Sequence, residues 1–228
     1  SEKGTNYKDF YWKNFLSICE TTEREFKLSP VEVRVINLEI GPKVNIPPIW
    51  NVSAKTLTRN CYVFKGKGIK KTENYDGLGY IKKFEKDQYC LKIYDKSMQN
   101  SLEERNIWRF EMKCTTSIKL KTCSGIITLQ DLKEYANHNK AMLTAVNLID
   151  DLVIFQEELL TLMTDEKDLA IIKSLSSEKQ WEDLHKQGRY VYRDTRKKYE
   201  SIVDKYCPYN YRKELKKMML ALMAVSCC

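Results

Sequence analysis

The sequence predicts an α+β fold, in which an N-terminal mixed or antiparallel sheet with flanking helices is followed by a C-terminal helical region. Two segments predict the sheet, because residues 91–96 and 107–113 alternate polar and apolar side chains with a period of two. From residue 128 onward apolar residues recur with helical spacing, which predicts the helices. We therefore expect a sheet domain over residues 1–125 and a helical region over 126–228 that packs on it.

Helical spacing, β-branched runs and chain breakers predict the other elements of the first region. They are a helix over 8–27, a strand over 31–40, a helix from about 54 to 64 with Ser53 as its cap, a turn at 65–68, and strands near 67–72 and 78–85. Ser29-Pro30 and Gly41-Pro42 are the breakers on either side of the first strand. The two strands that define the fold come next, joined by about ten polar residues that suit a long hairpin loop.

Capping residues and apolar spacing predict the helices of the second region. They cover residues 129–136 with Thr128 as the cap, 139–162, 165–175, 177–185, 188–206 and 209–225. Pro208 separates the last two helices. Within the long helix, Gln156-Glu157-Glu158 is interpreted as a solvated face.

Charge is segregated along the chain, which has a formal net charge of +8. Residues 55–96 hold eleven Lys and Arg against five acids, a net of +6, and residues 186–217 hold eleven against four, a net of +7. Between them, residues 131–183 hold five Lys against twelve acids, a net of −7. Two basic regions favour a polyanionic partner, whereas a basic surface without a partner is the alternative.

Cysteine usage and hydropathy indicate the compartment. The eight cysteines form no C-x-x-C pair, and with only two histidines a zinc site is not expected. No run approaches 18 apolar residues, and the N-terminus has no apolar leader core, so we expect no membrane association. Reduced thiols without a secretion signal predict a cytoplasmic protein.

Basic residues approach one stripe of the helix predicted over 188–206, and tyrosines are interleaved with them. Lys and Arg neutralise phosphates, and tyrosines stack on bases, so this stripe is a predicted nucleic-acid contact. The predicted contact residues are Arg189, Arg193, Arg196, Lys197 and Lys198, together with Arg212 in the last helix. The alternative is a solvated basic face with Tyr190, Tyr192 and Tyr199 packed beneath it.

The sheet provides a second predicted site. Arg109, Glu111 and Lys113 share one face of their strand, and Glu39 joins them if the 31–40 strand is a neighbour. Paired carboxylates such as Glu39 and Glu111 can hold Mg²⁺ or Mn²⁺. The alternative is cross-strand salt bridging, worth a few tenths of a kcal/mol per pair. We commit to no catalytic residue; Tyr94 and Glu111 are the side chains that a phosphodiester reaction would use.

Several motifs resemble those of replication-initiation factors from plasmids and mobile elements of Bacteroidetes-type bacteria. They are Asn6 to Phe10, Leu38-Glu39-Ile40-Gly41 through Pro47, Leu91 to Lys96, Arg109-Phe110-Glu111, and Gln180 to Leu184. The resemblance implies a protein that binds origin DNA, holds a divalent metal with carboxylates and nicks with a tyrosine. It places Glu39 and Glu111 at carboxylate positions, with Lys92, Tyr94 and Lys96 on the same sheet. No H-x-H metal cluster is present.

The function expected from these observations is nucleic-acid binding in a mobile genetic element, without nuclease activity and without a cofactor. Lys92, Lys96, Arg109 and Lys113 are the predicted phosphate contacts on the sheet. One alternative is an anti-CRISPR inhibitor that binds a host RNA-guided effector or its guide RNA. The other is a rolling-circle nickase that uses Mg²⁺ or Mn²⁺.

Overall fold

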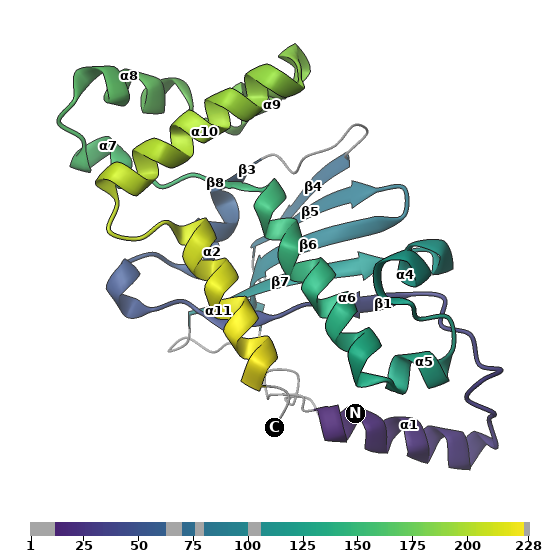
Figure 1. Cartoon of the computed structure of the whole chain (residues 1–228). Helices are drawn as coiled ribbons and strands as arrows, with labels where there is room; N and C mark the ends of the chain where they lie inside the picture. The colour runs from purple at the N-terminus through teal and green to yellow at the C-terminus, as the bar shows by residue number, and fades with distance from the viewer. Residues whose placement is uncertain (1–11, 63–69, 76–79, 100–105, 226–228) are drawn as a thin grey trace.

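The computed structural model describes residues 12–62, 70–75, 80–99 and 106–225 (Figure 1). It confirms the α+β class, with an antiparallel sheet in the N-terminal half and mostly helices after it. In these residues no helix is long and apolar enough to cross a membrane. The motif at 6–10 and the turn predicted at 65–68 lie outside the described residues.

The main sheet has the strand order β1-β7-β6-β5-β4, with antiparallel neighbours throughout. Its strands are β1 (Leu38–Ile40), β2 (Lys43–Asn45), β4 (Lys70–Tyr75), β5 (Tyr80–Lys86), β6 (Tyr89–Asp95) and β7 (Ile107–Cys114). Both β1 and β2 pair with β7 and keep one register, since Ile40 lies opposite Met112 and Lys43 opposite Arg109. The first 40 residues therefore add an edge strand beside the strand that carries Glu111.

The strand predicted over 31–40 is much shorter than expected. Only Leu38–Ile40 joins the sheet. Arg34, which precedes it, instead forms an isolated antiparallel bridge with Thr128. The Val35 amide donates to the Ile127 carbonyl at 2.9 Å, and the Leu129 amide donates to the Val33 carbonyl at 2.8 Å. These backbone partners lie almost 100 residues away, so the β-branched run alone did not reveal them.

One face of the sheet is apolar and is covered by α2 (Ala54–Arg59), α6 (Tyr135–Asn147) and α11 (Tyr211–Val225). Figure 1 shows α6 and α11 crossing this face. Trp108 and Phe110 are fully buried there, as the two-residue period predicts. Ser53 caps α2 as predicted, because its hydroxyl accepts from the Thr56 amide at 3.0 Å.

The long helix predicted over 139–162 is wrong. Helix α6 ends at Asn147, and the chain continues through η2 (Leu148–Asp151), β8 (Val153–Ile154) and α7 (Leu159–Leu162). Strand β8 pairs with β3 (Cys61–Tyr62), and the Phe155 amide donates to the Asn60 carbonyl at 2.8 Å. Residues 153–155 therefore form backbone hydrogen bonds with residues 60–62 in place of the hydrogen bonds of a continuous helix.

The remaining helices lie at the N-terminus, beside the sheet and in the C-terminal region. They are α1 (Trp12–Phe26), η1 (Pro48–Trp50), α3 (Lys96–Gln99), α4 (Ser117–Ser124), α5 (Leu129–Lys133), α8 (Glu166–Ser174), α9 (Glu178–Gln187) and α10 (Arg189–Tyr206). Helix α4 was not predicted, although Thr116 caps it and Gly125 ends it with a φ of 87°. Thr128 forms the predicted cap of α5, in a capping box with Asp131.

Candidate nucleic-acid interface

The sheet residues singled out from the sequence lie on one face, opposite the face that α2, α6 and α11 cover. Residues directly opposite each other on antiparallel strands point to the same side. Lys92 pairs with Glu111 and Tyr94 with Arg109. Strand β1 then adds its own carboxylate to this side. We call this surface the polar face, and its central residues are Glu39, Lys83, Lys92, Tyr94, Arg109, Glu111 and Lys113.

Ion pairs join the carboxylates of the polar face to its cations. The Lys92 ammonium donates to Glu39 Oε1 at 2.5 Å, from β6 across β7 to β1. Arg109 Nε donates to Glu111 Oε1 at 2.6 Å, and the Tyr94 hydroxyl donates to Glu111 Oε2 at 3.1 Å. The cross-strand salt bridges considered for this sheet are therefore present, and they hold the two cations in fixed positions.

Gly41 permits the close contact between the edge strand and β7. A Cβ atom at this position would lie 1.9 Å from the Phe110 carbonyl oxygen and 2.6 Å from the Glu111 Cα. No side chain fits there, because both neighbours are backbone atoms. The glycine in the sequence Leu38-Glu39-Ile40-Gly41 thus sets the distance between Glu39 and Glu111.

Cations crowd one end of the polar face. Lys96, at the start of α3, is only 6% exposed. Burial lowers its pKa, and the charges of Arg109 and Lys43 lower it further, although Glu111 acts in the opposite direction. The charges of Arg109 and Lys43 therefore both act on Lys96 at this end of the face. An anion bound here would relieve their repulsion.

The ionisation of Tyr94 and Glu39 bears on the chemistry that the face can perform. Burial and the neighbouring Glu111 charge raise the pKa of Tyr94, so its hydroxyl keeps its proton at neutral pH. Partial burial acts to raise the pKa of Glu39, but the hydrogen bonds with Lys92 and Glu111 and the charges of Lys92 and Lys113 together outweigh burial and lower it. The face thus presents a protonated phenol beside two carboxylates that are paired with Lys92 and Arg109.

A divalent metal does not fit the described residues of this face well. Mg²⁺ and Mn²⁺ favour several oxygen ligands, and the face offers two carboxylates that already bind Lys92 and Arg109. Across the described ranges, no group of three or more His, Cys, Asp or Glu side chains is arranged to hold a metal ion. The metal role of Glu39 and Glu111 therefore stays a prediction, and we derive no reaction step from it.

The basic stripe of α10 is divided between surface and interior. Arg189, Arg193, Lys197 and Lys198 are exposed. Of the interleaved tyrosines, Tyr190 is 70% exposed, with the Arg193 guanidinium 5.1 Å from its ring centre. Tyr192 and Tyr199 instead pack against Trp181 in a second apolar core. Only part of the predicted stripe is therefore accessible to a ligand.

Two of the predicted cationic contacts hold the helical region together. Arg196 donates to the carbonyls of Asp150 and Leu152, the latter at 2.8 Å. Arg212 donates from Nε to Glu200 at 2.9 Å and pairs with Asp150 at 3.3 Å. Their guanidinium groups are satisfied within the chain, so neither points freely toward a partner.

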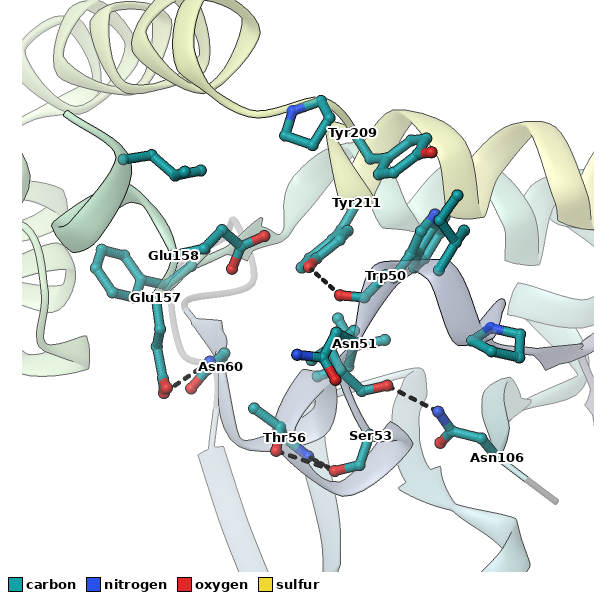
Figure 2. A pocket seen from close by; sticks show the side chains of 17 residues that line it. Trp50, Asn51, Ser53, Thr56, Asn60, Asn106, Glu157, Glu158, Tyr209 and Tyr211 are labelled. Atoms are coloured by element: carbon teal, nitrogen blue, oxygen red, sulfur yellow. Dashed lines mark hydrogen bonds between the residues drawn. The ribbon is translucent and has the colours of Figure 1, made fainter. Parts of the chain in front are cut away.

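A cavity of about 860 Å³ lies where the two halves of the chain meet (Figure 2). No motif in the sequence predicted it. Its walls come from the segment around η1 and α2, from Asn106, from the residues after β8, and from the start of α11. Gln156 beside it is 1% exposed and bonds to the Tyr209 carbonyl and the Tyr211 amide, at 2.8 and 3.0 Å. The solvated helix face predicted at this segment is therefore wrong at Gln156.

The polar face and the cavity are the two places where side chains from distant parts of the sequence converge. The polar face was predicted from strand periodicity, whereas the cavity depends on the β3–β8 pairing. Comparison of the chain with models of protein families, with curated proteins and with solved structures finds no match to any of them.

Proposed function

We propose that this chain is a nucleic-acid-binding protein of a mobile genetic element and that the polar face contacts the phosphates. The observation that carries the proposal is the convergence of Glu39, Lys92, Tyr94, Arg109 and Glu111 from separate segments onto that one face. These residues belong to the motifs that resemble replication-initiation factors. The resemblance and the geometry thus support the same surface.

Charge supports contact with a polyanion rather than with a neutral partner. Within the described part of the chain, neither Lys83 nor Lys113 forms an ion pair, and both are partly exposed. Lys92 and Arg109 are held in place by carboxylates, and Lys96 lies beside Arg109. Phosphates bound across this face would face several oriented cations, which is how backbone contacts produce affinity without sequence specificity.

The proposal does not include strand cleavage, because Tyr94 keeps its proton and both carboxylates are ion-paired. We place the protein in the cytoplasm, which agrees with the free thiols of its six described cysteines. Inhibition of a CRISPR effector and metal-dependent nicking stay alternatives.

Fluorescence anisotropy with labelled single-stranded DNA, single-stranded RNA and duplex DNA tests the proposal. The test variant replaces Lys83, Lys92 and Lys113 with Gln. A matched control replaces Lys167, Lys173 and Lys179, three exposed lysines of the acidic region, and so changes net charge equally. We expect the test variant to lose about tenfold or more in affinity and to flatten the salt dependence by about one unit of slope per lysine.

Equal losses in the two triple variants would show that only net charge matters and would contradict a specific face. No measurable binding by the unmodified protein at low salt would reject nucleic-acid binding altogether. A preference among the three labelled strands would identify the substrate class.

A further inference from the structure

We propose that the cavity between the two halves of the chain binds an organic cation, with a guanidinium or alkylammonium group as the recognised chemistry. This site is separate from the polar face and does not depend on nucleic-acid binding. The inference comes from the aromatic walls of the cavity, from its carboxylates and from the kinds of side chain that line it.

Aromatic rings form one wall of the cavity (Figure 2). The Trp50 and Tyr211 rings are stacked with centroids 5.0 Å apart, and the Tyr209 ring lies 6.2 Å from Trp50. The Tyr211 hydroxyl donates to the Trp50 carbonyl at 3.1 Å, which fixes the pair. Faces of aromatic rings attract ammonium and guanidinium groups. Trp50 and Tyr211 are buried, so the half-buried Tyr209 ring is the one that a ligand would contact, with the stacked pair behind it.

Carboxylates form the facing wall. Glu157 and Glu158 both line the cavity. Asn60 donates to Glu157 Oε1 at 3.0 Å, and Gln156 donates to Glu158 Oε1 at 3.1 Å, so each carboxylate has an amide donor. The Tyr211 hydroxyl also interacts with Glu158. Figure 2 shows the two acids on the side of the cavity across from Trp50. A cation between these walls would meet negative charge and aromatic faces together.

The side chains that line the cavity are acidic, although the protein as a whole is basic. The chain carries a net charge of +8, yet among the described residues that line the cavity none is Lys, Arg or His. Two acids without a basic partner disfavour a phosphate or any other anion there. The remaining polar lining consists of neutral amides and hydroxyls, such as Asn51, Ser53 and Thr56, which can orient a bound group.

The volume of about 860 Å³ lies within the range of small-molecule sites, so the cavity has room for more than a single cationic head group. Two sources could supply the head group, namely an arginine or lysine side chain of a partner protein, or a free polyamine. Both present the same chemistry to Tyr209 and Glu158. The experiment therefore includes a probe for each.

Isothermal titration calorimetry with the full chain tests the site. The peptide-like probe is arginine amide, and its neutral isostere is citrulline amide, in which a urea replaces the guanidinium. The polyamine probe is putrescine, and adenosine serves as a neutral aromatic competitor. We expect arginine amide or putrescine to bind at least tenfold more tightly than citrulline amide. The cation that binds more tightly identifies the source.

Charge-matched variants locate the binding. Glu157→Gln with Glu158→Gln should weaken binding of the cationic probe at least tenfold. Glu166→Gln with Glu182→Gln, two exposed acids of α8 and α9, should change it less than twofold. Tyr209→Leu should weaken binding several-fold, whereas Tyr190→Leu on α10 should not. Thermal unfolding confirms that each variant is folded.

Three results would overturn the proposal. Equal affinity for arginine amide and citrulline amide would show that the positive charge of the ligand does not contribute to binding. If neither cationic probe produces heat of binding at millimolar concentration, the cavity does not bind organic cations. Binding of adenosine that survives the Glu157 and Glu158 substitutions would make the cavity a nucleobase site instead.

Discussion

The polar face of the sheet and the basic stripe of α10 were both predicted as nucleic-acid contacts, yet the structure treats them differently. The polar face keeps its predicted strand residues together, except that Lys96, predicted in the strand over 91–96, begins helix α3 and is buried. The stripe on α10 is divided, since Arg189 and Lys197 are exposed, whereas Arg196 bonds to buried backbone carbonyls. The difference teaches that a charged residue on a sheet can be assigned to a surface more directly than one on a helix.

The physical reason is the repeat of each element. A strand has two sides, so one buried neighbour fixes the side of every other residue. A helix turns by about 100° per residue, and several of its sides can be covered by different neighbours. On α10, Tyr192 and Tyr199 enter one core while Arg196 reaches toward η2. The sequence of α10 therefore did not show which cations remain accessible.

The largest expected effect concerns the backbone contact that builds the polar face. Gly41→Ala places a methyl group against the Phe110 carbonyl, and β1 must move away from β7. We expect a loss of about 3 kcal/mol in the free energy of unfolding, measured by urea denaturation. Asn45→Ala, an exposed position on β2, is the control and should cost less than about 0.5 kcal/mol. Equal stability of the two variants would show that the edge strand is not held at Gly41.

The next effect tests whether Arg212 is structural. Arg212→Met removes the pairs with Glu200 and Asp150 from a partly buried site, and we expect it to cost about 2 kcal/mol. Lys213→Met, which breaks an exposed pair with Asp204, should cost less than about 1 kcal/mol. The nucleic-acid affinity of both folded variants should stay within about twofold of the unmodified protein, a change below roughly 0.5 kcal/mol. A tenfold loss with Arg212→Met alone would make this residue a contact after all.

A smaller effect separates phosphate binding from metal binding on the polar face. Glu111→Gln removes a negative charge beside Arg109 and Lys96. If the face binds phosphates, we expect affinity for nucleic acid to rise about threefold at low salt, roughly 0.7 kcal/mol. Asp183→Asn on α9 removes an acid that pairs with Lys186 and does not belong to the polar face, and it serves as the control. A fall in affinity that depends on Mg²⁺ or Mn²⁺ would instead favour the metal role of Glu111.

The smallest effect concerns a contact between the sheet and the helical region. Partial burial would raise the pKa of Glu73, but hydrogen bonds from Lys71 and Tyr80 outweigh burial and lower it to about 2. Lys71 also pairs with Glu178 of α9, so this cluster links β4 to the helical region.

Because the folded-state pKa of Glu73 lies below its ordinary value of 4.5, its stabilising effect is present above about pH 4.5 and is lost as the pH falls toward 2. Glu73→Gln should therefore flatten this part of the stability curve by less than about 1 kcal/mol. Denaturation at several pH values measures it, with the exposed Glu182→Gln as the control. An unchanged slope between pH 4.5 and 2 would contradict the role of this cluster.

Features that depend on local repeats and on contacts between near neighbours could be predicted from the sequence. The strand alternation at 107–113 correctly separated Trp108 and Phe110 from Arg109 and Glu111, because the strand period is a property of the backbone. The caps at Ser53 and Thr128 were also predicted correctly, since a cap binds an amide only three residues away.

The pairing of distant segments, and the division of charges between surface and interior, became known from the folded structure. The helix predicted over 139–162 is interrupted because Val153 and Ile154 pair with strand β3, more than 90 residues earlier. Arg196 and Arg212 became internal partners of Asp150, and the cavity beside Trp50 formed where the two halves meet. These outcomes depend on competition between partners that are remote in sequence, which no local period records.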